Sequence, residues 1–271
     1  MQPKLCILAG AGHLPSLLIK ACETASRPFV VIAFRGQAKP EDFASVPNVS
    51  WHRLGAGRAI LDEILNLGVR EVILAGAIRR PGLVSLWPDF WTLRKLLRSK
   101  ALNRGDDGLL RFVASLFEGD GIQVVGVPDV APELLTPTGQ LTICGPDDDA
   151  ANDVKIAREA AKELGRMDVG QAVVARSGRI IAHEDRRGTD VMLRRIENPG
   201  VPTGVLAKCI KPGQDRRMDL PAIGVDTVRN ASLAGLRGIA VDAGASLIIE
   251  RDATLDAAND AGIFIIGVDD E

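Results

Sequence analysis

The chain has 271 residues, enough for two compact domains, and its 46% apolar and 25% charged residues are typical of a soluble globular protein. A net charge of -2 excludes a general nucleic-acid binder, which carries a strong basic excess. No apolar run approaches the ~20 residues of a membrane-spanning helix. The first apolar run is also too short for a signal sequence, so we expect a soluble, cytoplasmic protein.

Strand-like and helical segments alternate through the first half of the chain. Continuous apolar runs predict strands, and segments with helical periodicity and end signals predict the helices between them. This rhythm is typical of a parallel sheet covered by helices, so we predict an α/β fold whose residues 1–130 form a Rossmann-like domain. The predicted strands are residues 4–9, 28–34, 71–75 and 122–127, and the predicted helices are residues 15–25 and 59–67.

A loop rich in Pro and Gly, residues 128–146, marks the predicted domain boundary. The helix predicted at 147–164 begins with three Asp residues, which we interpret as capping charges rather than metal ligands. Residues 131–271 are predicted to form a second, mixed α/β catalytic domain. Its other predicted strands are 171–175, 179–182, 205–210, 238–241, 246–249 and 262–268, with helices at 190–197, 227–235 and 253–261.

The four cysteines are Cys6, Cys22, Cys144 and Cys209, and none belongs to a CxxC pair. This spacing excludes a zinc knuckle and a thioredoxin-like motif. Each cysteine lies beside apolar residues, so we expect buried, inert, reduced thiols of a cytoplasmic protein.

A glycine turn, Gly10-Ala-Gly12-His13-Leu14, follows the first predicted strand. Two glycines between a strand and a helix allow the backbone to approach a phosphate or a ribose. Pro15 stands where a dinucleotide-binding fingerprint would have its third glycine, which argues against NAD. Nucleotide contact and a plain tight turn both remain open interpretations.

Two further polar groups of this domain are candidate ligand contacts. Arg79 follows a predicted buried strand, where open α/β sheets place their ligand loops. Asp106 and Asp107 belong to a Gly-Asp-Asp turn that could hold a sugar hydroxyl or could cap the helix that follows.

The segment 83–91 contains two of the three Trp residues and leads into the basic, amphipathic segment 93–100. Trp beside Lys and Arg is typical of an interfacial helix or of a cleft for acyl chains. A core helix with a solvated basic face is the alternative.

The densest chemistry lies between Gly188 and Thr227. Lys208 lies within an apolar strand, where a charge requires a partner. Carboxylates suit Mg²⁺, with Mn²⁺ as an alternative, while Lys and Arg suit phosphate oxygens. The pattern indicates phosphoryl or nucleotidyl transfer by metal-activated water. The candidate residues are Thr189, Asp190, Lys208, Gln214, Asp215, Arg217, Asp219, Asp226 and Thr227.

These motifs resemble those of the metal-dependent UDP-2,3-diacylglucosamine pyrophosphatases of lipid A synthesis, the type unrelated to calcineurin-like phosphoesterases. The most specific is the string Gln-Asp-x-Arg-x-Asp-Leu-Pro at 214–221, and the resemblance covers essentially the whole chain. It implies hydrolysis of that nucleotide-sugar lipid to 2,3-diacylglucosamine 1-phosphate (lipid X) and UMP, with Mg²⁺. It also implies a homodimer. The Trp-rich basic segment makes peripheral contact at the inner membrane a further expectation.

Carried onto this chain, the resemblance makes Asp226 the first candidate for the essential carboxylate, as metal ligand or orienter of water. Asp190, Asp215 and Asp219 are further candidates for metal and water, while Lys208 and Arg217 would neutralise the pyrophosphate. Substrate contacts are expected from Gly10, Gly12, His13, Leu14, Arg79, Asp106, Asp107, Thr189, Gln214 and Thr227. The segment 182–187 is more basic than the family pattern, which leaves the role of Glu184 open.

Two rival functions come from other classes. A Rossmann-like oxidoreductase is suggested by the glycine turn, but the second strand ends in Ala33-Phe34-Arg35 without the acidic residue that would bind a ribose. A non-catalytic nucleotide-sugar sensor would not need so many acidic residues in the second domain.

Overall fold

A computed structural model describes residues 2–78, 89–99 and 105–269 of the chain. The chain divides into two compact units, Met1–Pro132 and Glu133–Glu271. The boundary predicted after residue 130 lies two residues before this division. Arg79 lies outside the described residues.

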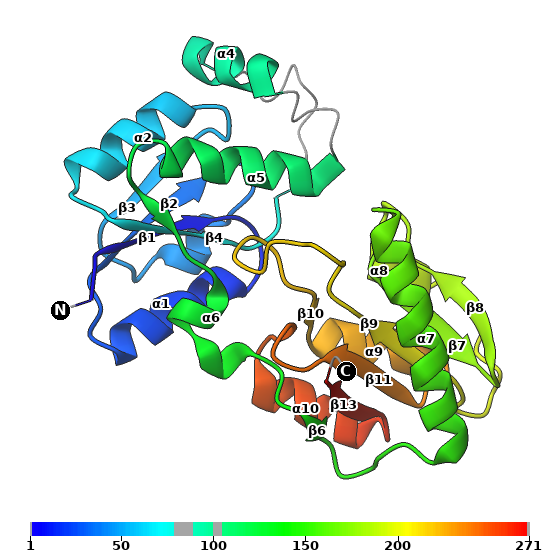
Figure 1. Ribbon diagram of the computed structural model, residues 1–271. Helices are drawn as coiled ribbons and strands as arrows, with labels where there is room; N and C mark the ends of the chain where they lie inside the picture. The colour runs from blue at the N-terminus through cyan, green and yellow to red at the C-terminus, as the bar shows by residue number, and fades with distance from the viewer. Residues whose placement is uncertain (1, 79–88, 100–104, 270–271) are drawn as a thin grey trace. The chain divides into compact units, whose positions relative to one another are not determined.

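The first unit contains a five-stranded parallel sheet with the order β3-β2-β1-β4-β5 (Figure 1). All five residues of β1 are buried, as expected for a strand covered by helices on both faces. The chain adds β2 and β3 on one side of β1 and then β4 and β5 on its other side. This change of direction creates a topological switch point at the carboxyl ends of β1 and β4. The strands are β1 (Leu5–Ala9), β2 (Phe29–Phe34), β3 (Val49–His52), β4 (Glu71–Ala75) and β5 (Gln123–Val124).

Helices cover both faces of this sheet. Figure 1 shows α1 and α6 on one face and α2 and α5 on the other. Pro15 lies in the first turn of α1, where its missing N–H costs no hydrogen bond. The helices are α1 (Leu14–Thr24), α2 (Gly57–Asn66), α4 (Phe90–Ser99), α5 (Gly105–Glu118) and α6 (Val127–Val130), with 3₁₀ turns η1 (Pro40–Phe43) and η3 (Pro132–Leu134).

The loops that follow β1 and β4 are paired with each other. Ala11 and Ala77 exchange two backbone hydrogen bonds of 2.8 Å. A Cβ at Gly10 would lie 2.6 Å from the Ala77 carbonyl oxygen, and one at Gly76 would lie 2.5 Å from that of Ala11. Loop pairing therefore accounts for Gly10 without any ligand. Gly12 differs, because it adopts a φ of 94° beside open space.

The second unit contains a mixed six-stranded sheet with the order β6-β13-β11-β9-β7-β8. Its three central strands β13, β11 and β9 are parallel, and the outer strands run antiparallel to their inner neighbours. β10 and β12 form a separate parallel pair. The strands are β6 (Gly139–Gln140), β7 (Ala172–Arg176), β8 (Arg179–His183), β9 (Val205–Lys208), β10 (Ala222–Ile223), β11 (Gly238–Asp242), β12 (Leu247–Ile248) and β13 (Phe264–Val268).

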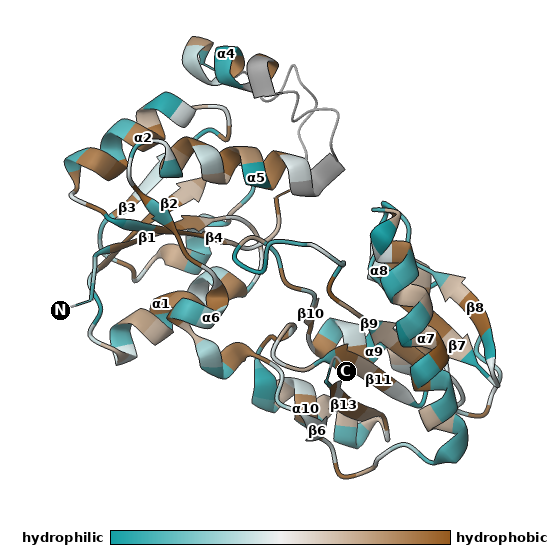
Figure 2. Cartoon of the chain, viewed as in Figure 1, coloured by the Kyte–Doolittle hydropathy of each residue, from teal (hydrophilic) through white to brown (hydrophobic). Residues whose placement is uncertain are grey.

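Two apolar layers enclose this sheet. The side chain of Leu206 packs in the layer that includes α8, α9 and α10, whereas those of its neighbours Val205 and Ala207 pack on the side of α7. Figure 2 shows the apolar residues concentrated on the strands and the hydrophilic ones on the outer surface of α7. The helices are α7 (Asp148–Arg166), α8 (Thr189–Leu193), α9 (Val225–Leu233) and α10 (Arg251–Asp260).

Two local expectations have clear outcomes. The capping role of Asp147 is confirmed, because its carboxylate accepts a hydrogen bond of 2.9 Å from the Ala150 N–H at the start of α7. The strand predicted at 122–127 is wrong in length, since only Gln123–Val124 pair as β5. Gly126 instead begins α6, and its N–H donates to the Asp129 carboxylate at 2.9 Å.

The cysteines are mostly interior residues. Cys6, Cys22 and Cys209 are buried, and Cys144 is half-buried. None of the four forms a disulfide. In the part of the chain that the structure describes, no helix is both long enough and apolar enough to cross a bilayer.

Candidate active site

The candidate site lies at one edge of the six-stranded sheet. Lys208 ends β9 and pairs in register with Ala172 at the start of β7. On the other side of β7, the Glu184 N–H donates to the Ala172 carbonyl oxygen at 2.8 Å. Residues directly opposite each other across strands project from the same face of a sheet. The side chains of Lys208 and Glu184 therefore project from one face on either side of the small Ala172 side chain.

Glu184 is a buried carboxylate, with 7% of the residue exposed. One of its oxygens accepts a hydrogen bond of 2.7 Å from the Thr189 hydroxyl, and the other accepts one of 2.8 Å from the Gln171 N–H. A Cβ at Gly170 would lie 2.9 Å from the Glu184 carbonyl oxygen, so the chain approaches closely there. These contacts hold the start of α8 against the start of β7.

Lys208 is half-buried, and its Nζ donates to the Ala222 carbonyl oxygen at 2.9 Å. Burial lowers the pKa of this ammonium, while the carboxylates of Glu184, Asp219 and Asp190 oppose that shift. An ammonium has three donors, so Lys208 has capacity for phosphate oxygens beyond its bond to Ala222. These three carboxylates thus supply the negative charge that a lysine within an apolar strand requires.

Asp190 and Asp226 belong to neighbouring helices. The Asn230 side chain of α9 donates to the Asp190 carboxylate of α8 at 3.0 Å. Asp226 lies four residues before Asn230, so both project from the same side of α9. Asp226 itself is exposed in the first turn of α9 and accepts a bond of 3.1 Å from Arg229. The Thr227 hydroxyl accepts from the N–H of residue 224 and caps this helix at 3.3 Å.

The loop between β9 and β10 contains two internal polar pairs. Both oxygens of the Asp215 carboxylate accept hydrogen bonds from the Arg217 guanidinium, at 3.0 and 2.7 Å. The Gln214 amide donates to the Asp219 carboxylate at 3.0 Å. To bind pyrophosphate, Arg217 would therefore have to release Asp215 or contact Asp215 and the phosphate oxygens at the same time.

Among the described residues, no three His, Cys, Asp or Glu side chains converge to hold a metal ion. The predicted metal ligands Asp190, Asp219 and Asp226 thus do not form a three-carboxylate cluster, and each accepts a hydrogen bond from a different neighbour.

The other candidates belong to the first unit. His13 immediately precedes α1 and is exposed, and Leu14 begins that helix. Asp106 and Asp107 lie in the first turn of α5, but their side chains are outside the described part of the structure. Of the second-unit candidates, Asp190 and Asp219 lie near enough to Lys208 to act on its charge, and the first-unit candidates lie at separate loops of their own sheet.

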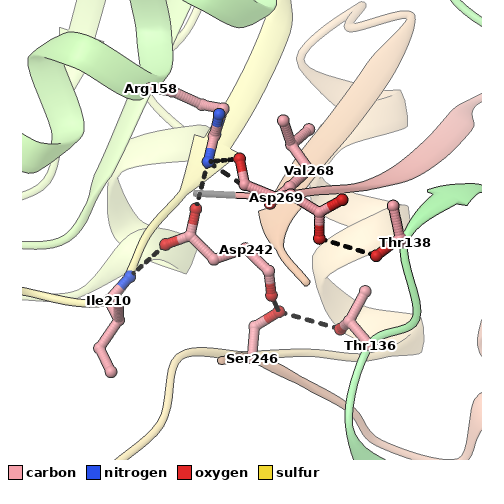
Figure 3. Close-up of polar contacts among 8 residues, drawn as sticks. All are labelled: Thr136, Thr138, Arg158, Ile210, Asp242, Ser246, Val268 and Asp269. Carbon is pink, nitrogen blue, oxygen red and sulfur yellow. Dashed lines mark hydrogen bonds and ion pairs between the residues drawn. The ribbon is translucent and has the colours of Figure 1, made fainter. Parts of the chain in front are cut away.

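A buried ion pair supports the strand end that carries Lys208 (Figure 3). The Asp242 carboxylate at the end of β11 accepts from Arg158 at 2.9 Å and from the Ile210 N–H at 2.8 Å. The Asp242 carbonyl oxygen accepts from the Ser246 hydroxyl, whose oxygen is hydrogen-bonded to the Thr136 hydroxyl at 2.9 Å. This network fixes the chain two residues after Lys208.

Several of these polar residues were not singled out from the sequence. Gln171 and Asn230 are isolated amides, and Asp242 reads as the end of an apolar strand. Glu184 belongs to a charge run that resembles a solvated face. One local signal was available in the sequence. Glu184 comes at the end of a predicted strand, so its side chain lies at the same edge of the sheet as Lys208.

Comparisons with known proteins match both units. The LpxI N-terminal domain family matches residues 4–134, and the LpxI C-terminal domain family matches residues 137–266. The UDP-2,3-diacylglucosamine pyrophosphatase LpxI of Caulobacter vibrioides is 39% identical over 280 residues, covering 98% of each chain. The chain belongs to the LpxI family.

Solved structures resemble this LpxI-family chain only weakly. The biotin carboxylase subunit of pyruvate carboxylase is 15% identical with a TM-score of 0.27, covering 65% of this chain and 35% of that one. The Hydrogenobacter thermophilus 2-oxoglutarate carboxylase biotin carboxylase domain has a TM-score of 0.26, 16% identity, and coverage of 66% and 38%. These values carry no conclusion about the LpxI-family chain.

In this LpxI-family chain, Glu184→Gln should reduce turnover while preserving the fold. Glutamine can accept from Gln171 and donate to the Thr189 hydroxyl, so the change removes charge and little else. We expect kcat to fall roughly 10- to 100-fold. Glu184 raises the pKa of Lys208, so its loss should move the alkaline limb of the pH–rate profile to lower pH.

The adjacent carboxylate supplies the control for Glu184. Asp185 is partly exposed and paired with Arg187, which holds the pKa of Asp185 well below its usual range. Asp185→Asn should leave kcat within about twofold of the parent. An alkaline limb that stays in place in Glu184→Gln would contradict the electrostatic role.

Asp242→Asn should destabilise the second unit. The side chains of Asp242 and Arg158 are 3% and 13% exposed, so the substitution leaves a buried guanidinium uncompensated. We expect the free energy of unfolding in urea to fall by about 3 kcal/mol. Glu163→Gln removes an exposed partner of Arg166 on the same helix α7 and should cost about 0.5 kcal/mol or less. Equal losses in the two variants would refute the buried-pair argument.

Proposed function

We propose that this chain hydrolyses the pyrophosphate bond of UDP-2,3-diacylglucosamine in lipid A biosynthesis, releasing lipid X and UMP. The observation that carries the proposal is the 39% identity, over 98% of both chains, to a protein named for this activity. The charges around Lys208 support it, because they suit a reaction in which phosphate charge must be neutralised.

In this reaction, the Lys208 ammonium donates to the pyrophosphate oxygens while the Ala222 carbonyl oxygen fixes its direction. Glu184 favours the protonated form of Lys208 and holds Thr189 at the start of α8. Arg217 supplies a second positive charge from the loop after β9. Catalysis then depends on positioning and charge neutralisation by these fixed groups.

Mg²⁺ is the proposed cofactor, and Mn²⁺ is the alternative. Asp190 and Asp219 both act electrostatically on Lys208, so two carboxylates with hard oxygen ligands lie near the same ammonium. Mg²⁺ is commonly held by one or two carboxylates together with substrate phosphates, so a three-carboxylate cluster is not required. When bound, the ion would polarise the pyrophosphate and lower the pKa of water. Asp226 would orient that water from the first turn of α9.

The first unit supplies further proposed substrate contacts. We infer a Rossmann-like domain from its parallel order and its switch point between β1 and β4, where α/β sheets bind ligands. The open backbone at Gly12, with His13 and Leu14 at the start of α1, is suited to a phosphate or ribose. A homodimer remains a prediction, for which light scattering of the purified protein is the direct measurement.

One experiment tests the activity and the position of attack together. The protein is incubated with Mg²⁺ and UDP-2,3-diacylglucosamine in H₂¹⁸O, and the label is located by mass spectrometry. Mg²⁺-dependent release of UMP and lipid X, with one of them labelled, is the expected result. Unchanged substrate would refute the proposal and favour a nucleotide-sugar sensor. Tight NADH binding with no hydrolysis would favour the oxidoreductase.

A further inference from the structure

Helix α4 exposes an apolar stripe. Phe90, Leu93 and Leu97 are 80%, 38% and 65% exposed. Their spacing of three and four residues places them on one side of the helix. Figure 2 shows α4 with both apolar and hydrophilic residues at its surface. Contiguous exposed apolar side chains on one helix are typical of an interaction surface.

The opposite side of α4 is anchored to α2. The Asp89 carboxylate accepts from the Arg58 N–H at 3.0 Å and from the Thr92 N–H at 2.7 Å, so it bridges the first turns of both helices. The half-buried Trp91 ring lies within 5.9 Å of the Arg58 guanidinium and 5.4 Å of the Lys95 ammonium. The apolar stripe is therefore presented on a helix whose orientation is fixed.

The basic charge of α4 indicates the kind of surface that the helix contacts. The helix contains Arg94, Lys95 and Arg98 and no acidic residue, although the whole chain has a net charge of -2. Arg94 is exposed next to the apolar stripe, and Lys95 is exposed on the side that carries Trp91. Apolar and basic side chains together match a bilayer of anionic lipids, which offers acyl chains beneath negative headgroups. We propose that α4 is an interfacial helix that docks this protein onto an anionic lipid surface.

A second copy of the chain fits this stripe less well. A symmetric dimer brings the same patch of both copies together, which would place Arg94 near its own equivalent. An anionic bilayer satisfies this charge instead. The inference does not depend on the proposed hydrolase activity, because vesicle binding is measured without substrate.

The test is cosedimentation of the full-length protein with vesicles of pure phosphatidylglycerol or pure phosphatidylcholine. The parent should bind only the former. Arg94→Gln should lower the partition coefficient roughly fivefold. Leu97→Ser should lower it about tenfold, because an inserted apolar side chain is lost. The matched control is Leu233→Ser, since Leu233 is 66% exposed in the second unit and should not affect binding.

Three results would overturn the proposal: no binding of the parent to phosphatidylglycerol, equal binding to both lipids, or equal binding of Leu97→Ser and Leu233→Ser variants. A parent dimer that becomes a monomer in Leu97→Ser would also overturn it and identify a second copy as the partner. Turnover of detergent-dispersed substrate should match the parent in these variants. A parent without turnover would refute the hydrolase function and leave the vesicle result intact.

Discussion

Asp226→Ala should lower kcat for UDP-2,3-diacylglucosamine hydrolysis by about 10³-fold, because it removes the carboxylate proposed to orient the attacking water. The side chain of Asp226 is 79% exposed at the start of α9, so its loss should leave the core intact. Asp226 lies one helical turn from Asn230, which binds Asp190. Asp226 is therefore linked, through Asn230 and Asp190, to the carboxylates that act on Lys208.

The matched control for Asp226 is Asp252→Ala. Asp252 is also exposed in the first turn of a helix, α10, of the same unit, and it shares the favourable interaction with the helix dipole. Its loss should leave kcat within about twofold, while both variants unfold at similar urea concentrations. An Asp226→Ala protein that is folded and turns over at the parent rate would remove Asp226 from the mechanism.

Lys208→Met should also lower kcat by about 10³-fold, because it removes the cation proposed to neutralise the pyrophosphate in the transition state. Methionine is similar in length to the apolar stem of lysine. Removing the cation that compensates a buried carboxylate is destabilising, but Glu184 keeps its hydrogen bonds from Thr189 and Gln171. We therefore expect a folded protein with lower resistance to urea, and kcat is compared under conditions in which the circular dichroism of the variant matches that of the parent.

Lys211→Met serves as the control for Lys208. Lys211 lies three residues further along the chain, and its Nζ donates to the Asp168 carboxylate at 2.7 Å. Removing this ammonium should change kcat by no more than about threefold. If Lys208→Met retained the kcat of Lys211→Met, phosphate neutralisation would have to come from Arg217 or from another cation.

The central strands could be predicted from the sequence because they are continuous apolar runs. β1 and β9 are of this kind, since parallel strands covered on both faces require apolar residues throughout. β3 was missed because its alternating sequence Val-Ser-Trp-His is only four residues long, and it forms through its pairing with β2. The two-residue strands β6 and β10 likewise depend on tertiary pairing that no local pattern encodes.

The need of Lys208 for a compensating charge could be predicted from the sequence, but the groups that supply this charge could not. A lysine within an apolar strand indicates a charge that requires a partner. Its largest compensating charge, Glu184, lies 24 positions earlier in a run that resembles a solvated face. The antiparallel pairing of β8 with β7 buries that carboxylate and brings it to the same edge. Such convergence is a property of strand order, which local sequence patterns do not specify.

The distribution of the cysteines makes this chain suited to site-selective labelling. Maleimides react with thiolates, and burial raises the pKa of Cys6, Cys22 and Cys209, the last to about 12. Those three thiols stay protonated and shielded at neutral pH. Cys144, half-buried next to the 86% exposed Ile143, is the accessible one of the four. A dye on Cys144 would thus mark the second unit without first removing any natural cysteine, and a single cysteine introduced in the first unit would complete a pair of labels for fluorescence energy transfer between the two units.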